Sequence, residues 1–536
     1  MLGGYGGFGA RISRRLAAAG YRVLVVGRSM DKARAFCARD PALVPLPLDR
    51  ADIAAALVSE KPDLVVDASG PFQAMDYAVP RACIAARIPY CDIADGRDFV
   101  CGISVLNDAA RAAGVAVIAG ASSVPALSGA VVRHLADGLD RVRAVEMAIS
   151  ASNRATAGPA VAASILGQVG QPVRLFRGGR IAETRGWQEL ERLDFAMPGT
   201  KPITGRLAAI ADVPDLALLP DRLMGRPAVV FRAGTELGWQ NRFLWAMVWP
   251  VRWGLVAGLS RFSHWLLPMQ NLTRKLGSDR SAMMVRLFGD RAAARIERRW
   301  TLIADGGDGP EIPTLAIPVL AARILAGKEP PGARDAGLAL GLLEYEPAFA
   351  GLAIKHHVEE VNAAPSLYRR IMGGDYDALP PSLRAMHDIF RDGGAAGEAE
   401  VFGASNGLGR IVARMMRFPP PGKHALHVWF RERDGGETWT RNFGGQCFSS
   451  RLSQSGNRLV EKFGPLRFFF ELSRTAEGLR MDMRGWSFLG LRLPLAMAPR
   501  SDAREFERQG RFHFDVPIVM PLIGTVVHYR GWLEPV

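Results

Sequence analysis

The N-terminal part of the chain alternates short apolar runs with amphipathic stretches. The apolar runs, typical of strands buried in a parallel sheet, lie at 21–26, 43–48, 63–68, 89–93 and 115–118. Between them, apolar residues recur at helical spacing, at 10–19, 31–38, 51–59, 77–86 and 104–113. This order predicts an α/β fold with a Rossmann-type, doubly wound parallel sheet.

After residue 127 the pattern changes twice. A helix to residue 136 and an alternating segment at 143–150 are typical of a mixed α+β domain. From residue 425 onward, turn sequences rich in Gly, Asp and Asn separate period-two segments such as 427–431, 467–471 and 511–515. The last part therefore predicts an antiparallel β-rich domain with its own core.

Glycines dominate the opening residues 3–9, GGYGGFG. Gly4, Gly6 and Gly9 fit the turn G-x-G-x-x-G that joins a first strand to a first helix. In that turn the glycines permit a tight bend, close approach of the backbone to a pyrophosphate, and close packing of helix on sheet. The turn predicts a dinucleotide site, and the alternative is a glycine-rich loop without a ligand. The candidate cofactor-binding residues here are Gly4, Tyr5, Gly6, Gly7, Phe8 and Gly9.

Only Met1, Leu2 and Gly3 precede this turn. The central first strand of such a sheet needs about five residues. We therefore expect the true start of the protein to lie upstream, with a short apolar segment that supplies the strand.

The run at 21–26 is followed by Gly27, Arg28 and Ser29. An NAD-specific site usually carries an acid here, whereas an arginine beside a small hydroxyl residue suits the 2′-phosphate of NADP. Arg28 and Ser29 therefore predict NADP(H) as the cofactor. The alternative is an arginine on a solvated loop.

Two later loops complete the predicted cofactor site. Asp49 follows the run at 43–48, near the expected place of an adenine, and the sequence SGPF follows the run at 63–68. A Gly-Pro pair is equally typical of a plain turn. The candidates in these loops are Asp49, Ser69, Gly70, Pro71 and Phe72.

No sharp catalytic constellation is present, because hydride transfer needs little beyond a positioned nicotinamide and exclusion of water. Tyr90, Asp92 and Asp95 follow the run at 89–93 and are candidates to supply a proton or orient a polar group. They are equally typical of structural residues.

The adjacent His356 and His357 lack a fitting third ligand, so we predict no metal site.

The most apolar stretch, 239–268, contains five tryptophans. Trp245, Trp249 and Trp253 are spaced by four, so they share one face of a helix that Pro250 should kink or divide. Arg252, Arg261 and His264 interrupt the stretch and disfavour a membrane span. Two alternatives remain, helices that line a substrate cleft or the core, and a peripheral segment that dips tryptophans into a membrane.

Charge and cysteine content narrow the class of protein. The net charge is +14, but the positive residues are spread along the chain and only eight are lysines. Without a basic run or a nucleic-acid-binding motif, we predict no nucleic-acid partner. Five cysteines without C-x-x-C spacing predict reduced thiols and a cytoplasmic protein, with membrane association if the tryptophans contact a bilayer.

Several blocks together resemble a known family. GGYGGFG, VVGRS, VVDASGPFQ and RRWTLIADGGDGPEIPTLA, within residues 1–343, are similar to saccharopine dehydrogenase-like oxidoreductases, whose superfamily includes trans-acting enoyl reductases. RNFGGQCFSS, EKFGPLRFFFEL and HYRGWLEP resemble a bacterial C-terminal domain of unknown function, number 4166. The enoyl-reductase-like branch carries a Gly-Glu pair after Tyr-x-Asp, whereas here Tyr90-Cys91-Asp92 is followed by Asp95-Gly96.

The resemblance implies a discontinuous layout. We expect a Rossmann NADP-binding domain at 1–126, an inserted α+β substrate domain at 127–310, a return helix and linker at 311–360, and the β-rich domain at 366–536. It implies an NADP-dependent oxidoreductase, which the tryptophans suggest acts on an apolar or lipid-like small molecule. The alternatives are an imine or amino-acid dehydrogenase of the saccharopine type, and a non-catalytic NADP- or lipid-binding protein.

Overall fold

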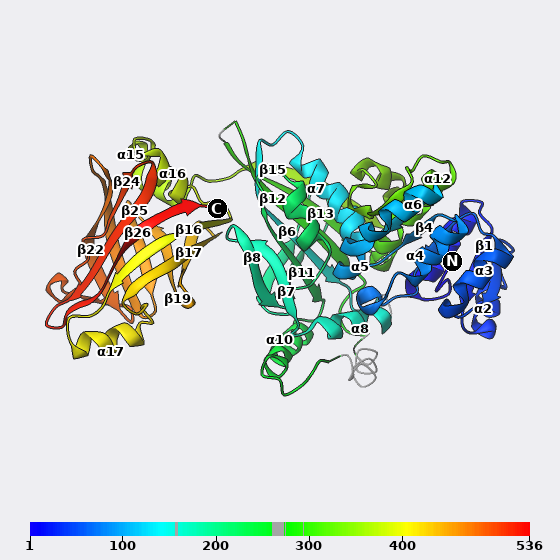
Figure 1. Cartoon of the computed structure of the whole chain (residues 1–536), viewed down its shortest axis with the longest axis horizontal. Helices are drawn as coiled ribbons and strands as arrows, with labels where there is room; N and C mark the ends of the chain where they lie inside the picture. The colour runs from blue at the N-terminus through cyan, green and yellow to red at the C-terminus, as the bar shows by residue number, and fades with distance from the viewer. Residues whose placement is uncertain (156–158, 260–272, 274, 293) are drawn as a thin grey trace.

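The computed structural model describes residues 1–155, 159–259, 273, 275–292 and 294–536 (Figure 1). In the view of Figure 1 the first parallel sheet lies at the right, a mixed sheet in the centre, and a closed antiparallel sheet at the left. Each of the two end regions has a large buried apolar cluster of its own, and the first cluster extends into the central sheet.

The first sheet is parallel, in the order β14-β5-β4-β3, and β1-β2 form its other part. Leu2 bridges Asp67 of β3 and Val26 of β1, so its backbone joins the two parts. The expected Rossmann-type sheet is therefore confirmed. Its strands are β1 (Val23–Gly27), β2 (Leu43–Pro47), β3 (Val65–Asp67), β4 (Tyr90–Asp92), β5 (Ala116–Ala119) and β14 (Gly332–Asp335).

The backbone of the first four residues lies at the centre of this sheet, the place for which the sequence predicts an upstream strand. The Leu2 amide donates to the Val66 carbonyl at 2.8 Å, and the Ala68 amide donates to the Leu2 carbonyl at 3.0 Å. On the other side, the Val26 amide donates to the Met1 carbonyl at 2.9 Å. The glycine turn is thus held between β1 and β3.

Helices flank the sheet where the apolar periodicity predicts them. α1 (Gly7–Ala18) buries Ile12 and Leu16, one turn apart, as the pattern requires. α5 follows β4 closely and was not predicted, because it is too short to show periodicity. The other helices here are α2 (Met30–Cys37), α3 (Ile53–Glu60), α4 (Ala78–Ala86), α5 (Arg97–Gly102), α6 (Asn107–Ala113) and α7 (Ser128–Ala136).

The chain returns to the first sheet after the central domain. α12 (Ala316–Leu325) packs beside α1, and β14 pairs with β5. Glu311 accepts hydrogen bonds from Arg11 and Arg15 of α1 at 2.8 and 2.7 Å. β15 (Ile354–Asn362) instead joins the central sheet by pairing with β13, so the end of the predicted return segment 311–360 lies outside the first domain.

The central sheet has the mixed order β15-β13-β12-β6-β11-β10-β9. Its strands are β6 (Arg141–Ala151), β9 (Glu191–Phe195), β10 (Ile203–Ile210), β11 (Ala228–Thr235), β12 (Ser281–Arg291) and β13 (Ala294–Ala304), with β15. A hairpin of β7 (Pro172–Arg177) and β8 (Arg180–Arg185) and the helices α8 (Pro159–Gln168), α9 (Asp215–Arg222) and α10 (Gly238–Arg252) complete the domain.

α10 carries the first part of the tryptophan-rich stretch, but its tryptophans do not form the core. The helix buries Asn241, Leu244 and Val248, whereas Trp245 and Trp253 are 40% and 67% exposed. The core alternative is therefore wrong for these rings. Pro250 lies in the last turn of α10 and does not divide the helix. Residues 260–268 of the stretch, which include Arg261, His264 and Trp265, lie outside the described residues. No described helix is long and apolar enough to cross a bilayer.

The C-terminal strands form an antiparallel sheet that closes through pairing of β21 with β22. Its other neighbours follow the order β21-β20-β19-β18-β17-β16-β26-β25-β24-β22-β23, which confirms the predicted β-rich domain. The strands are β16 (Asp392–Phe402), β17 (Gly422–Arg433), β18 (Gly436–Phe443), β19 (Gln446–Ser455), β20 (Arg458–Phe463), β21 (Leu466–Arg474), β22 (Gly478–Phe488), β23 (Leu491–Leu493), β24 (Arg504–Arg508), β25 (Arg511–Met520) and β26 (Gly524–Pro535).

Short helices lie at the two ends of the closed sheet. α14 (Leu367–Met372), α15 (Gly374–Asp377) and α16 (Pro381–His387) pack at one end, where Arg370 donates to the carbonyl of Gly435 in the β17–β18 turn. α17 (Gly407–Met415) connects β16 to β17 at the other end. Apolar side chains fill the interior between them, Phe430, Phe443 and Phe512 among them.

Candidate NADP site and adjoining cavity

The glycine turn closes on itself before α1 begins. The Gly6 amide donates to the Gly3 carbonyl at 2.9 Å. A Cβ on Gly9 would lie 2.0 Å from the Gly3 oxygen, so no side chain fits at that position. A Cβ on Gly6 would have only the Gly3 oxygen, at 3.1 Å, as a neighbour within 4 Å. The outer side of Gly6 is therefore open, as close approach of a diphosphate requires.

α1 presents its N-terminal amides beside this open side. The first turn of a helix leaves N–H groups without intrahelical acceptors, and the helix dipole favours an anion there. The first turn of α1 contains no acidic residue. Gly7, Phe8 and Gly9, which the sequence predicts to bind the diphosphate through their amides, form this first turn.

Tyr5 links the glycine turn to the end of β1. Its ring lies against Gly27, where a Cβ would be 2.2 Å from the tyrosine Cε1 atom. Its hydroxyl accepts a hydrogen bond from the Ser29 amide at 3.0 Å, while the Ser29 side chain caps α2. Arg28, between them, is exposed and forms no ion pair with a described residue. The predicted 2′-phosphate residues therefore lie next to the predicted diphosphate site.

An arginine that the sequence analysis missed lies at the same sheet edge. Arg50 donates to Asp67 Oδ2 at 2.5 Å and to Ser69 Oγ at 2.7 Å. Asp67, fully buried at the end of β3, also accepts from the Ser69 amide at 2.9 Å. The Arg50 Nη2 atom is buried without a partner among the described residues, which leaves a donor for a ligand. The predicted Asp49 is exposed and caps the turn at Ala51.

The loops after β3 and β4 lie against each other. A Cβ on Gly96 would be 3.1 Å from the backbone of Phe72, whose ring is buried against Phe99 with 5.3 Å between centroids. The predicted Gly70 and Pro71 lie beside it and are at least partly exposed. The structure therefore brings the SGPF loop to the edge that also carries Asp95.

The three candidate catalytic residues have different surroundings. Tyr90 is fully buried, and burial raises its pKa well above the usual range. Asp92 is also fully buried and accepts from the amides of Ala94 and Gly120 at 2.9 and 2.7 Å. These bonds tie the end of β4 to the end of β5, and burial raises the Asp92 pKa to about 7.

Asp95 is half-buried at the junction with the central domain. Gln73 donates to Asp95 Oδ1 at 3.0 Å and to the Ser164 hydroxyl of α8 at 2.8 Å. Burial raises the pKa of Asp95 above its usual value. Of the three candidates, Asp95 is the one whose bonded partner also contacts the central domain.

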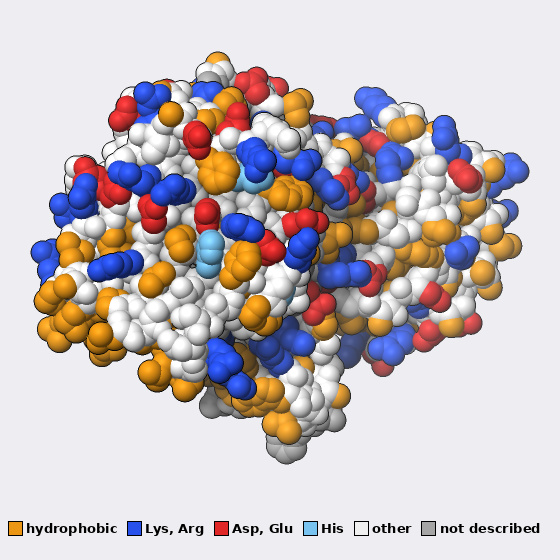
Figure 2. Space-filling view, turned by 60° about the vertical axis from the view of Figure 1, so that its left-hand side comes forward, with side chains coloured by type: hydrophobic (Ala, Val, Ile, Leu, Met, Phe, Trp, Pro, Cys, Tyr) orange, Lys and Arg blue, Asp and Glu red, His pale blue; other side chains and the backbone are white. Residues whose placement is uncertain are grey.

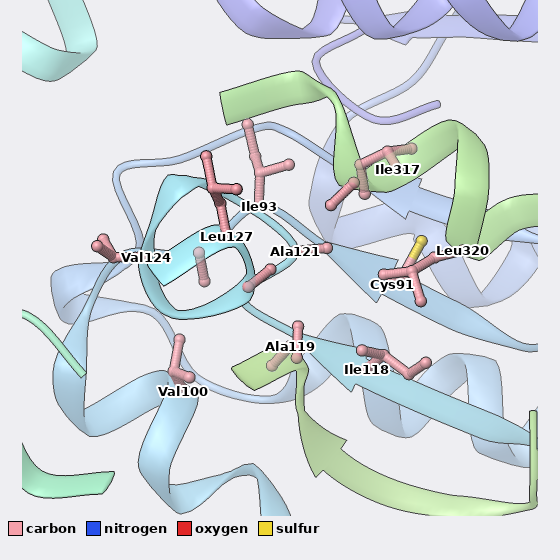
Figure 3. Packing of buried hydrophobic residues seen from close by; sticks show 14 of the residues in the cluster. Cys91, Ile93, Val100, Ile118, Ala119, Ala121, Val124, Leu127, Ile317 and Leu320 are labelled. Carbon is pink, nitrogen blue, oxygen red and sulfur yellow. The ribbon is translucent and has the colours of Figure 1, made fainter. Parts of the chain in front are cut away.

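A cavity of about 180 Å³ lies behind the loop that follows β5. Figure 3 shows Val124 and Leu127 on this loop, and both belong to the same buried apolar cluster as Ile93 and Ile317. Most of the cavity wall is apolar, from residues of α7, α9 and the segment after β14, with Pro125, Val132, Leu218, Leu219, Leu223 and Leu338. No sequence motif marks it, because the segments are far apart in the chain.

Charged groups also border the cavity. Asp215 is fully buried, and its Oδ1 accepts from the Ser128 hydroxyl at 2.5 Å. Its Oδ2 has no partner among the described residues, and burial raises the Asp215 pKa to about 6. Arg222 is held by both carboxylate oxygens of Asp335, at 2.8 and 2.5 Å. The cavity thus combines an apolar wall with one unpaired acid atom.

Comparison with known proteins assigns two parts of the chain. Residues 1–118 match the saccharopine dehydrogenase NADP binding domain, and residues 379–533 match a domain of unknown function, DUF4166. Residues 1–118 thus form an NADP-binding domain of the saccharopine dehydrogenase type. The family resemblance and the NADP cofactor expected from the sequence are confirmed. No curated protein matches the chain.

Three solved structures are similar to this chain. An amine dehydrogenase from Mycobacterium smegmatis is 11% identical, with TM-score 0.36, over 62% of this chain and 92% of that one. GenD2 from gentamicin A biosynthesis, in complex with NAD, is 14% identical, with TM-score 0.31, over 67% and 95%. A dehydrogenase (MviM) from Clostridium difficile is 9% identical, with TM-score 0.28, over 62% and 90%.

Proposed function

We propose that the protein is an NADP(H)-dependent reductase of an apolar, lipid-like small molecule. The amides of Gly7, Phe8 and Gly9 hold the diphosphate, and Arg28 with Ser29 binds the 2′-phosphate. The loop at 69–72 flanks the nicotinamide, and Arg50 donates to the same cofactor. When bound, NADPH supplies a hydride.

The cavity behind β5 is the observation that carries the choice of substrate. Its wall is mainly leucine, valine and proline, and it adjoins the carboxyl edge of the parallel sheet, where such folds bind their ligands. Its volume of about 180 Å³ is below the roughly 300–1,000 Å³ of pockets for drug-sized ligands. It therefore receives one end of a chain-like molecule.

Asp95 is the proposed proton donor. Reduction of a double bond by a hydride also consumes a proton, and burial, which raises the pKa of Asp95, favours the protonated form that can donate one. Gln73 orients Asp95 toward the domain junction and contacts Ser164. The buried Tyr90 and Asp92 hold the sheet edge in place.

A second candidate function is an imine or amino-acid dehydrogenase. Asp215, Arg133 and Arg222 border the same cavity, as recognition of an amino acid requires. Arg133 donates to the Leu340 carbonyl at 2.5 Å, and Arg222 is paired with Asp335. Because both arginines already have partners, the apolar wall favours the first candidate.

Steady-state NADPH oxidation by the full-length protein separates these functions. We expect turnover with medium-chain enoyl or keto thioesters, and none with 2-oxo acids plus an amine. Asp95→Asn should lower kcat by about 10²-fold or more without changing NADPH affinity. The reverse substrate preference would support the second function, and tight NADPH binding without turnover of either class would indicate a non-catalytic protein.

The exposed Trp239 and Trp245 of α10, and Trp253 directly after it, support the peripheral membrane contact expected for the stretch 239–268. Trp245, Trp249 and Trp253 contact one another in sequence, with 6.4 and 6.0 Å between ring centroids. Amphipathic rings of this kind favour the interface between water and lipid. We include contact of α10 with a bilayer in the proposed function, as the route to a lipid-like substrate.

A further inference from the structure

α17 is packed with its apolar residues outward. The only fully buried residue of the helix is Gly409, where a Cβ would lie 3.0 Å from the Thr525 carbonyl of β26. Leu408, Ile411 and Met415 share the opposite face and are 63%, 59% and 78% exposed. A surface helix usually turns its apolar stripe toward the core, so this orientation needs a partner.

Neighbouring turns continue this apolar surface at the same end of the closed sheet. Leu522, in the turn between β25 and β26, is fully exposed, and Asn406 at the start of α17 donates to the adjacent Ile523 carbonyl. The segment after β23 reaches the same end, because Arg500 bridges Val519 of β25. Exposed apolar residues of this segment, of β23 and of the turn before β23 are Leu489, Leu491, Leu495 and Met497.

The charge of this surface points to an anionic partner. From residue 402 to residue 424, and again from 488 to 500, the sequence contains no aspartate or glutamate. Arg410, Arg414 and Arg417 are exposed and form no ion pair with a described residue. Basic residues beside exposed aliphatic ones, without acids, are typical of helices that lie on anionic bilayers.

The position of α10 relative to α17 favours a planar partner. Both helices lie along the lower edge of the molecule in Figure 1, far apart along its longest axis. Figure 2 is turned about the vertical axis, and hydrophobic side chains again gather along the lower edge. α10 likewise contains arginines and no acid. A flat bilayer reaches both helices at once, whereas a small protein partner would not.

We propose that the α17 end of the C-terminal domain docks on anionic lipid bilayers. The docking surface consists of Leu408, Ile411, Met415 and Leu522, with Arg410, Arg414 and Arg417 at the lipid headgroups. The docking surface and α10 contact the same bilayer. Only this joint contact rests on the proposed function, which includes the binding of α10 to lipid. The docking surface itself is independent of the redox chemistry.

Co-sedimentation of the full-length protein with vesicles tests this proposal. We expect binding to vesicles of equal parts phosphatidylglycerol and phosphatidylcholine, and much weaker binding to phosphatidylcholine alone. The triple variant Leu408→Ser, Ile411→Ser, Met415→Ser should bind the mixed vesicles about tenfold more weakly. A matched triple variant, Val58→Ser, Val105→Ser, Leu343→Ser, removes equally exposed side chains from other surfaces and should bind like the wild type.

The melting temperature of each variant serves as the measure of folding, because the C-terminal domain has a core of its own. The proposal is wrong if the wild type does not bind the mixed vesicles, or if the α17 variant melts and binds vesicles as the wild type does. It is also wrong if the α17 variant changes only the oligomeric state measured by light scattering, because a second copy would then be the partner. If the wild type binds the vesicles but does not oxidise NADPH with any tested substrate, the proposed function is contradicted and the proposed docking surface is still supported.

Discussion

The hydroxyl of Tyr5 accepts a hydrogen bond from the backbone amide of Ser29, at 3.0 Å. Tyr5 lies inside the glycine turn, and Ser29, after β1, caps the start of α2. The contact therefore connects the proposed diphosphate site to the proposed 2′-phosphate site. Because the ring also lies against Gly27, the loop that carries Arg28 is held at both ends.

Replacement of Tyr5 by phenylalanine keeps the ring and removes the acceptor of this bond. We expect the dissociation constant for NADPH to rise about 2- to 10-fold, the equivalent of about 0.5–1.5 kcal/mol for one hydrogen bond. Fluorescence titration measures the change, and the value for NADH should move less. A lower melting temperature with unchanged NADPH affinity would instead assign Tyr5 a purely structural role.

Arg28 should distinguish the two nicotinamide cofactors. Arg28→Ala removes the proposed charged partner of the 2′-phosphate, so NADPH affinity should fall roughly 10- to 100-fold while NADH affinity stays constant. Arg39→Ala, at another exposed arginine of the same domain, is the control and should change neither affinity. Equal loss for both cofactors after Arg28→Ala would contradict the assignment.

Features encoded by neighbouring residues were predictable from the sequence. The glycine turn, α1 and β1 follow one another within thirty residues, so motif and periodicity were sufficient to place them. The short β3 and β4 were also found, because buried parallel strands are apolar throughout.

Features that depend on distant segments were not predictable. The pairing of Arg50 with Asp67, and of Arg222 with Asp335, joins residues that only the sheet brings together. Periodicity showed that the α10 tryptophans share a face, but it could not show which face meets the core. That choice depends on Trp187 and Leu166, which fill the space opposite Leu244 and Val248.

Asp92 should make stability depend on pH. Its pKa in the folded protein is about 7, against an ordinary value of 3.8, so the folded state binds more protons between these values. The stabilisation that comes from protonated Asp92 is therefore fully present below about pH 4 and is lost as the pH rises through 7. Over this range the free energy of unfolding falls by up to about 1.4 kcal/mol per pH unit.

Asp92→Asn keeps a carbonyl oxygen for the Ala94 and Gly120 amides and cannot ionise. Melting temperatures of the variant and the wild type, compared from pH 5 to pH 8, should differ increasingly in favour of the variant as the pH rises. A difference that stays constant over this range would show that Asp92 does not titrate there.

Glu146 should hold the C-terminal domain on the central sheet. This buried carboxylate of β6 accepts from Arg391 at 2.9 and 2.6 Å and pairs with Arg433 at 2.6 Å. Burial alone would raise the pKa of Glu146, but the two arginines hold it well below the usual range. Both arginines belong to the C-terminal domain, so one carboxylate joins the two domains.

Glu146→Gln leaves these guanidinium groups buried without their counter-charge. We expect a loss of about 3–5 kcal/mol in the free energy of the interface, seen as proteolytic cleavage near 361–365 and as separation of the domains in solution scattering. Glu534→Gln is the control, because its ion pair with Arg511 is half exposed and contributes at most about 1 kcal/mol. Equal resistance of both variants to protease would show that other contacts, such as His427 with the Gly178 carbonyl, hold the domains together.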